Sequence, residues 1–301
     1  MKIFVPPIKC QGIKTKLVDW IKENLSDIKF ERWVEPFMGS GVVGFNIRPQ
    51  KAIFADTNLH LINFYNAIKN GEITPAITRN FLESESLKLA KSGQKYYNEV
   101  RERFNSDFKS LDFLFLNRSC FNGMIRFNRY GKFNVPFGHK PQRFSKAYIT
   151  KIVNQIDYIY KAAKILNWSF VVQDFRDTLR YLSKTDFVYC DPPYIGRHTD
   201  YFDTWNEEDE KDLFNLLNKF DGKYILSTWH SNQFRSNKEI EKYNELNILT
   251  KKHFYHVGAS EKNRNAMTEA LILNYMLPKN KIDYRVQACL QLQLMEPKRK
   301  Y

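Results

Sequence analysis

The sequence has little cysteine, and the four cysteines that it has are scattered. Cys10, Cys120, Cys190 and Cys289 form no CxxC pair, and the histidines do not cluster around them. We therefore expect neither a zinc site nor a disulfide framework, and no HExxH motif supports other metal chemistry. The chain also has no GxxxxGK(S/T) loop to cradle the phosphates of ATP or GTP. The sequence predicts chemistry without a metal ion.

Long apolar runs are missing as well. No stretch approaches the roughly 18 to 20 apolar residues that span a bilayer, and the N-terminus lacks the apolar core of a signal peptide. The sequence therefore predicts a cytoplasmic protein without a membrane partner.

Positive charge, in contrast, is abundant. The 301 residues include 47 lysines and arginines against 33 acids, which gives a formal net charge of +14. This balance favours a polyanionic partner because each basic side chain that neutralises a phosphate releases a counterion. A basic surface kept for solubility is the plainer explanation, and charge alone does not separate DNA from RNA or an anionic membrane.

Short apolar runs alternate with amphipathic ones from Arg32 onward. This alternation is typical of a parallel sheet covered by helices, so the sequence predicts a doubly wound α/β sheet. We expect strands at residues 33–35, 52–55, 169–172, 187–190, 224–228, 253–257 and 269–274. Helices are expected at residues 15–24, 59–70, 177–182 and 207–218.

The interval from residue 74 to 167 breaks this alternation. It holds helix-like and loop-like sequence, rich in Arg, Lys, Asn and Phe, with no convincing βαβ unit. An insertion of this length is best explained as a separate, mainly helical domain. The predicted division is a sheet domain of residues 1–73 and 168–280, an inserted domain of residues 74–167 and a tail of residues 281–301.

The most specific motif is Asp191-Pro192-Pro193-Tyr194, directly after the fourth predicted strand. The prolines fix the backbone, the Asp191 carboxylate and the Pro192 carbonyl offer hydrogen-bond acceptors, and Tyr194 offers a flat stacking surface. Two acceptors around an exocyclic amino group draw its nitrogen toward pyramidal geometry and support the positive charge that develops as it attacks. The motif favours methyl transfer to an amino group over its alternative, an ordinary Asp-Pro turn.

A glycine loop and an acid follow the first two predicted strands. Gly39 and Gly41 stand where a strand should turn into a helix, but GSGVVG does not match the GxGxxG dinucleotide fingerprint. Asp56 ends the second strand, where an acid reaches the hydroxyls of a ribose or caps the next helix, and Asn58 could take the capping role. A ribose-binding acid without a phosphate loop favours S-adenosylmethionine as the cofactor.

With these motifs in this order, the chain resembles the Dam-like (alpha-group, D12 class) DNA adenine-N6 methyltransferases up to about residue 277. The stretches FVPPIKCQGIKTKLV, WVEPFMGSGVVGFN, DFLFLNRSCFNGMIRFN, FNVPF, VYCDPPYIGRH and FYHVGASEKNR look closest to EcoRV-type modification enzymes, which act within GATATC. The resemblance implies a Rossmann-like methyltransferase sheet of seven mostly parallel strands with an inserted target-recognition domain. It also implies that the target adenine is flipped out of duplex DNA.

The resemblance assigns cofactor and catalytic roles to residues of this chain. Gln11, Gly12 and Lys14 match the N-terminal cofactor motif, Phe37, Gly39 and Gly41 the glycine loop, Asp56 the ribose acid, and Asp174 and Phe175 the residues that bracket the cofactor adenine. Asp191, Pro192 and Tyr194 match the catalytic motif, and Asp191 also borders the cofactor.

The resemblance assigns DNA contacts as well. They are Lys9, Asn117, Arg118, Phe121, Asn122, Met124, Arg126, Asn134 and Pro136. Phe121 matches an aromatic wedge beside the extruded adenine, Arg126 an arginine that reads a base edge, and Lys9 a lysine on the first guanine. Plainer alternatives are a core position for Phe121, a solvated charge for Lys9, and phosphate contacts for the basic residues.

The function implied is that of a monomeric modification enzyme in a type II restriction-modification system, with a restriction endonuclease that shares its GATATC site. Four alternatives stay open at this point: methylation of RNA, methylation of a protein amide, methylation of another GAT-containing site, and a non-catalytic DNA-binding relative.

Overall fold

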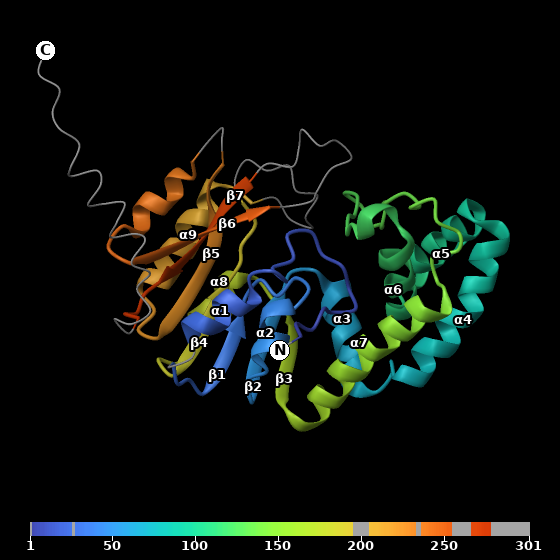
Figure 1. Cartoon of the computed structure of the whole chain (residues 1–301), viewed down its shortest axis with the longest axis horizontal. Helices are drawn as coiled ribbons and strands as arrows, with labels where there is room; N and C mark the ends of the chain where they lie inside the picture. The colour runs from blue at the N-terminus through green and yellow to red at the C-terminus, as the bar shows by residue number, and fades with distance from the viewer. Residues whose placement is uncertain (1, 26–27, 195–204, 233–235, 255–265, 278–301) are drawn as a thin grey trace, which may run out of the picture.

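A central sheet organises the computed structural model, which describes residues 2–25, 28–194, 205–232, 236–254 and 266–277. Its strands lie in the order β3-β2-β1-β4-β5-β7-β6 (Figure 1). They are β1 (Arg32–Glu35), β2 (Lys51–Asp56), β3 (Asn167–Val172), β4 (Asp186–Cys190), β5 (Lys223–Asn232), β6 (Asn247–Phe254) and β7 (Ala266–Leu273). Strands β1 to β5 pair in parallel, whereas β7 runs antiparallel to β5 and β6. The predicted seven-stranded, mostly parallel sheet is confirmed.

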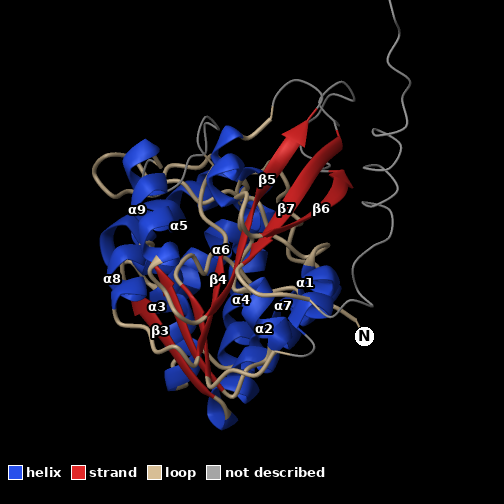
Figure 2. Cartoon of the chain, turned by 90° about the vertical axis from the view of Figure 1, so that its left-hand side faces the viewer, coloured by secondary structure: helices blue, strands red, loops and turns tan. Residues whose placement is uncertain are grey.

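Helices cover both faces of the sheet because successive side chains of a strand point to opposite faces. Trp33 and Phe187 pack on one face, and their neighbours Val34 and Val188 pack on the other. The first face is covered by α1 (Val18–Leu25), α2 (Val42–Ile47) and α3 (Leu59–Asn70), and the second by α8 (Phe175–Arg180) and α9 (Glu207–Asn218). Figure 2 shows α8 and α9 on one side of the strands and α1 and α2 on the other.

A set of helices lies between α3 and β3 in the sequence. It comprises α4 (Pro75–Ser92), α5 (Gln94–Asp107), α6 (Ser110–Ser119), the 3-10 turn η1 (Phe121–Gly123) and α7 (Lys146–Ile165). These helices stand beside the sheet, at the end where β3 lies and away from β6 (Figure 1). Their buried rings, such as Phe104 and Phe115, belong to the same core as Trp33 of the sheet. The inserted helices therefore share one hydrophobic core with the sheet layer, which they reach mainly through α3.

The ends of some elements differ from the prediction. β6 begins at Asn247 rather than at residue 253. The prediction missed its first residues because this edge strand carries exposed Lys251 and Lys252 and no long apolar run marks it. Residues 255–257 of that prediction lie outside the described residues. α8 begins at Phe175 rather than at residue 177, since the Asp174 side chain caps it. α1 begins at Val18, after a turn. The other predicted strands and helices are confirmed, with shifts at some ends.

Within the described ranges, no helix combines the length and the apolar character that crossing a membrane requires. Nor do three or more His, Cys, Asp or Glu side chains of those ranges gather as they would around a metal ion. Cys10, Cys120 and Cys190 are free thiols. Cys289 lies outside the part of the chain that the structure describes.

Candidate active site

The strand order reverses between β1 and β4, and the candidate site lies at this reversal. β1, β2 and β4 are parallel, so the residues that follow them meet at one edge of the sheet. Phe37 and the glycine loop follow β1, Asp56 ends β2 and Asp191 follows β4. The crevice outside the carboxyl ends of such strands is where open α/β sheets bind ligands. The fold thus brings the predicted cofactor and catalytic residues to a common edge.

Lys14 connects the N-terminal segment to the residues that follow β4. Its buried ammonium group donates a hydrogen bond of 2.7 Å to the Tyr194 hydroxyl and lies 3.1 Å from Oδ1 of Asp191. Oε2 of Glu269, on β7, lies 3.9 Å from the same ammonium group and accepts a hydrogen bond of 3.2 Å from the Tyr194 hydroxyl. The sequence predicts Lys14 at the cofactor, and the structure places its ammonium group beside Asp191 and Tyr194.

The segment that carries Lys14 is anchored on both sides of it. Ile8 and Leu17 are buried in the core. Between them, Gln11 and Gly12 form an exposed turn, and the φ angle of 71° at Gly12 lies in the left-handed region that favours glycine. The turn lets the chain reverse at the surface and direct Lys14 inward.

The Asp191 carboxylate is more basic than that of an ordinary aspartate. Burial is the largest cause, and the negative charge of Glu269 acts in the same direction, while the ammonium group of Lys14 opposes both. Together they raise the pKa of Asp191 to about 6. The side chain is still 21% exposed, so a substrate group can reach it. At neutral pH the carboxylate is mostly ionised and able to accept hydrogen bonds.

Asp56 holds the glycine loop in place. The backbone N–H of Gly39 donates to Oδ2 of Asp56 at 2.8 Å, and that of Asn58 donates to Oδ1 at 2.9 Å. Gly39 and Gly41 have φ angles of 48° and 73°, which favour glycine. A Cβ atom on Gly41 would lie 2.5 Å from the Phe45 ring, whereas one on Gly39 would meet nothing within 4 Å. The loop is fixed from below and open above Gly39.

The helix after Asp56 is capped by Asn58. The Asn58 side chain accepts hydrogen bonds from the backbone N–H groups of His60 and Leu61. The capping role therefore belongs to Asn58, and the Asp56 carboxylate orients the glycine loop.

Three aromatic rings form a wall beside the glycine loop. Phe37 stacks on Phe175 with ring centroids 5.2 Å apart, and the Trp205 ring lies 5.5 Å from Phe37 and 5.3 Å from Phe175. Phe175 is buried, so it supports the wall from behind. The Asp174 carboxylate caps α8 and lies 3.4 Å from the Arg176 guanidinium. No sequence motif marks Trp205, which only the fold brings to this wall.

Asn117 ties the N-terminal segment to the turn at the end of α6. Its Oδ1 accepts from the backbone N–H of Lys9 at 2.8 Å, and its Nδ2 donates to the carbonyls of Lys9 and Gly123 at 2.9 and 3.1 Å. A Cβ atom on Gly123 would lie 2.4 Å from Cδ of Lys9. The Lys9 side chain therefore passes closely over this turn, and burial is the largest cause that lowers its pKa.

The structure contradicts the prediction that Asn117 and Arg118 contact DNA themselves. Both side chains are buried, at 0% and 4% exposure. The Arg118 guanidinium donates to the Gln155 side chain at 2.7 Å, to the Tyr148 hydroxyl at 3.2 Å and to the backbone carbonyl of Pro7. A buried guanidinium needs such partners because an unpaired one is costly. Arg118 and Asn117 hold the framework on which the neighbouring turn stands.

The turn itself presents other predicted residues to the outside. Phe121 is 49% exposed, and Asn122 and Pro136 are exposed beside it. The backbone N–H of Phe121 donates to the carbonyl of Pro136 at 2.9 Å, which joins the two segments. The core alternative for Phe121 is therefore wrong.

Arg126 and Asn134 lie together on the same surface. Nε of Arg126 donates to Oδ1 of Asn134 at 2.8 Å, and both residues are half-buried, as is Met124. The basic residues Arg129, Lys132 and Lys140 are exposed nearby in sequence. The segment thus combines an exposed ring with positive charge.

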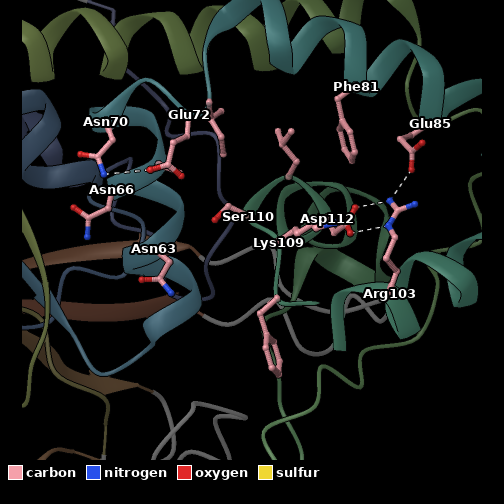
Figure 3. Close-up of a pocket in the computed structure, with 14 residues that line it drawn as sticks. Asn63, Asn66, Asn70, Glu72, Phe81, Glu85, Arg103, Lys109, Ser110 and Asp112 are labelled. Carbon is pink, nitrogen blue, oxygen red and sulfur yellow. Dashed lines mark hydrogen bonds and ion pairs between the residues drawn. The ribbon is translucent and has the colours of Figure 1, made fainter. Parts of the chain in front are cut away.

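A groove of about 810 Å³ lies between α3 and the inserted helices (Figure 3). Asn66 and Asn70 line it from α3. On the other side, Arg103 of α5 bonds to Asp112 of α6 at 2.8 Å and to Glu85 of α4 at 2.9 Å. These ion pairs brace three helices against one another. The groove contains none of the predicted catalytic, cofactor or DNA-binding residues.

Comparisons with known proteins match most of the chain. A sequence model of the D12 class N6 adenine-specific DNA methyltransferases matches residues 11–257. Type II methyltransferase M.MjaIII of Methanocaldococcus jannaschii is 30% identical over 297 residues, which cover 90% of this chain and 99% of that protein. A DNA adenine methylase of Serratia marcescens is 37% identical over 191 residues, or 62% of this chain and 66% of that protein. Type II methyltransferase M.FokI of Planomicrobium okeanokoites is 29% identical over 280 residues, or 89% of this chain and 42% of that protein.

The family match includes the glycine loop, Asp56 and the motif from Asp191 to Tyr194, and the M.MjaIII match extends over nearly the whole of both chains. The chain therefore belongs to the D12 class of N6 adenine-specific DNA methyltransferases.

Proposed function

We propose that this protein transfers a methyl group from S-adenosylmethionine to N6 of an adenine that is flipped out of duplex DNA. One observation carries the proposal. Asp191, directly after a central strand, has its carboxylate paired with Lys14, and the same Lys14 holds the hydroxyl of Tyr194. A hydrogen-bond acceptor and a stacking ring are thus fixed side by side at the edge that also bears Asp56 and the glycine loop.

The chain's own groups suit an amino substrate. Lys14 engages Oδ1 of Asp191, so Oδ2 can accept from an adenine N–H group, and the Pro192 carbonyl can accept from the second N–H. These two hydrogen bonds localise the lone pair on N6 and favour its attack. Tyr194 stacks on the base and replaces the neighbours that it loses when it leaves the duplex. An Asp191 carboxylate with a pKa near 6 can also take the proton that N6 loses.

The residues at the strand ends fit a nucleoside cofactor. A ligand can approach the backbone above Gly39, where a Cβ atom would meet nothing within 4 Å. Asp56 lies under this loop, and Phe37 flanks it with an aromatic face. We propose that Phe37, Gly39, Gly41 and Asp56 hold S-adenosylmethionine, with Gln11 and Gly12 near its amino-acid end and Phe175 behind Phe37. The cofactor would supply an electrophilic methyl group on its sulfonium sulfur.

The inserted segment suits the DNA substrate. We propose residues 74–167 as the recognition domain, residues 1–73 and 168–280 as the catalytic domain, and residues 281–301 as a tail. Phe121 is the exposed ring that can enter the base stack, while Lys9, Arg126 and Asn134 face bases or phosphates on the same surface. The proposed DNA contacts are supported by the exposure of Phe121 in a segment that also carries basic residues, in a chain of net charge +14.

We further propose GATATC as the site and a type II restriction-modification system as the context. The support for this site is the resemblance of six stretches to EcoRV-type modification enzymes that we infer from the sequence, and two of the relatives above are named type II methyltransferases. In this proposal the enzyme acts in the cytoplasm as a monomer. A cognate endonuclease cuts the same sequence without needing to bind it.

The test measures transfer of labelled methyl groups from S-adenosylmethionine to two duplexes that differ only at the GATATC site, and to a structured RNA. We expect labelling of the GATATC duplex, at adenine N6, and none of the RNA. Equal labelling of both duplexes would overturn the site, and labelling of the RNA would overturn the substrate. An Asp191→Ala variant that methylates as well as the wild type would overturn the mechanism.

A further inference from the structure

Glu269 is a fully buried carboxylate in the middle of an apolar strand. It lies on β7, in the sequence Glu269-Ala270-Leu271-Ile272-Leu273, and is 0% exposed. Leu271 and Leu273 pack in the core on the α1 face of the sheet, and the two-residue period of a strand points Glu269 to that same face. Burying an ionised group there is unfavourable unless it is paired. Glu269 pairs with Lys14 at the candidate active site.

Two of its contacts lie at the candidate active site. Oε2 of Glu269 accepts the hydrogen bond of the Tyr194 hydroxyl at 3.2 Å, and it lies 3.9 Å from the ammonium group of Lys14. The same hydroxyl accepts a hydrogen bond from Lys14 at 2.7 Å. The phenol oxygen of Tyr194 is thus held from two sides by groups on different parts of the chain. Hydrogen bonds at this far end of the ring limit how far the ring can tilt.

Glu269 also divides the charge of Lys14. The ammonium group lies between Asp191 at 3.1 Å and Glu269 at 3.9 Å, so it does not belong to Asp191 alone. Without the second carboxylate, the ammonium group would neutralise Asp191 more completely and weaken it as a hydrogen-bond acceptor. Lys14 therefore contacts both acids at this point.

We propose that Glu269 is a positioning residue for the methyl transfer: it holds the Tyr194 ring through its hydroxyl and shares Lys14 with Asp191. The inference rests on the proposed function, because it takes Tyr194 and Asp191 as the groups that receive the flipped adenine. In this proposal Glu269 acts on the substrate through these two residues.

The test compares Glu269→Met with Glu269→Gln. Methionine fills the space and removes the acceptor, whereas glutamine keeps an amide oxygen for the Tyr194 hydroxyl. We expect Glu269→Met to lower kcat by about ten- to a hundredfold, because a misplaced reacting group costs this much, with KM for DNA changed less than about twofold. Glu269→Gln should recover part of the loss.

A buried glutamate elsewhere in the chain gives the control. Glu85 is 4% exposed, accepts the Tyr96 hydroxyl at 2.6 Å and pairs with Lys88 at 2.9 Å, which is the same chemistry away from the site. Glu85→Met should alter the unfolding midpoint without lowering kcat. If Glu269→Met keeps the kcat of Glu85→Met, Glu269 is only structural and the proposal is wrong.

Two further measurements keep the inference separate from the proposed function. In a Tyr194→Phe background, Glu269→Met should lower kcat by less than it does in the wild type, and full additivity would contradict action through the hydroxyl.

Without the methyl donor, a duplex with 2-aminopurine at the target should show altered emission with Glu269→Met, since the flipped base loses its fixed stacking ring. If Glu269→Met does not fold, Glu269→Gln is judged alone: it should keep nearly the wild-type emission but lower kcat, because it holds the ring without the charge that shares Lys14, and a wild-type kcat would overturn the proposal. A wild-type protein that methylates no adenine would instead remove the proposed function itself.

Discussion

The ammonium group of Lys14 lies 3.1 Å from the carboxylate of Asp191, although the whole inserted segment lies between the two residues in the sequence. Lys14 is 4% exposed and Asp191 is 21% exposed, so little water screens the pair. The ammonium group lowers the pKa of Asp191, while burial and Glu269 raise it. The ionisation of Asp191, the proposed acceptor, therefore depends on a residue of the N-terminal segment.

Replacing Lys14 should change the pH dependence of methylation and not only its rate. In Lys14→Gln, the pKa of Asp191 rises because the opposing positive charge is gone, so less of the carboxylate is ionised at neutral pH. We expect kcat to fall by about ten- to a hundredfold at pH 7 and to recover in part as the pH is raised toward 9. The measurement is kcat at a series of pH values. A loss of equal size at every pH would show that Lys14 acts only through packing.

The wild-type enzyme should lose activity in mild acid. The pKa of Asp191 is raised to about 6, and the protonated carboxyl group cannot accept two hydrogen bonds as the carboxylate does. We expect kcat/KM to be constant near neutral pH and to fall through a midpoint near pH 6. Stability should be followed in parallel by circular dichroism, so that unfolding is not mistaken for titration. A midpoint near that of an ordinary aspartate would contradict the prediction.

Glu35 should make the fold less stable as the pH rises. It is 2% exposed at the end of β1, and burial raises its pKa to about 8 from the ordinary 4.5. Between these values the folded state holds a proton that the unfolded chain releases. The stability that protonated Glu35 gives to the fold is therefore fully present below its ordinary pKa of 4.5 and is lost as the pH rises through 8. Between these two pH values the loss is about 1.4 kcal/mol per pH unit.

The measurement for Glu35 is the free energy of unfolding in urea at pH 6 and pH 7.5. Glu35→Gln should remove the decline that burial of this carboxyl group causes in the wild type. Glu31, an exposed glutamate directly before β1, provides the control: Glu31→Gln should keep the wild-type decline. Parallel curves for Glu35→Gln and the wild type would show that Glu35 is not protonated in the folded state.

The sequence predicted the parts of the site that lie next to strand ends, because parallel strands carry whatever follows them to one edge. Asp56, Gly39 and Asp191 are of this kind. It did not predict Glu269 as a partner of Tyr194, since the two are 75 residues apart and no motif in the mostly apolar strand marks its one acid as part of the site. The sequence does not reveal that Arg118 is buried, for a related reason. Its hydrogen-bond acceptors lie 37 and 111 residues away in the sequence, and only the packed fold brings them together.

Phe121 should matter for base flipping and little for stability. Its ring is 49% exposed at the turn after α6. We expect Phe121→Ala to reduce the emission gain of 2-aminopurine at the target position and to raise KM for DNA, while the free energy of unfolding changes by less than about 1 kcal/mol. Tyr181, 81% exposed after α8, is a control for loss of an exposed ring. Phe133, 1% exposed, controls for loss of a buried one, and Phe133→Ala should cost about 3 to 5 kcal/mol. Equal emission in Phe121→Ala and Tyr181→Ala would exclude the wedge.

Gly123→Ala should displace Lys9 and weaken sequence discrimination. Gly123 has a φ angle of 69°, and its added Cβ atom would lie 2.4 Å from Cδ of Lys9. Gly71→Ala is the matched control, because Gly71 has a φ angle of 85° but its Cβ atom would meet only Tyr160 at 4.0 Å. Both variants should lose about 1 to 2 kcal/mol of stability from the left-handed backbone. Only Gly123→Ala should lower the ratio of kcat/KM between a GATATC duplex and one with the first guanine replaced, because only there does the lysine move. If both variants keep the wild-type ratio, Lys9 does not read that base pair and its charge serves the phosphates instead.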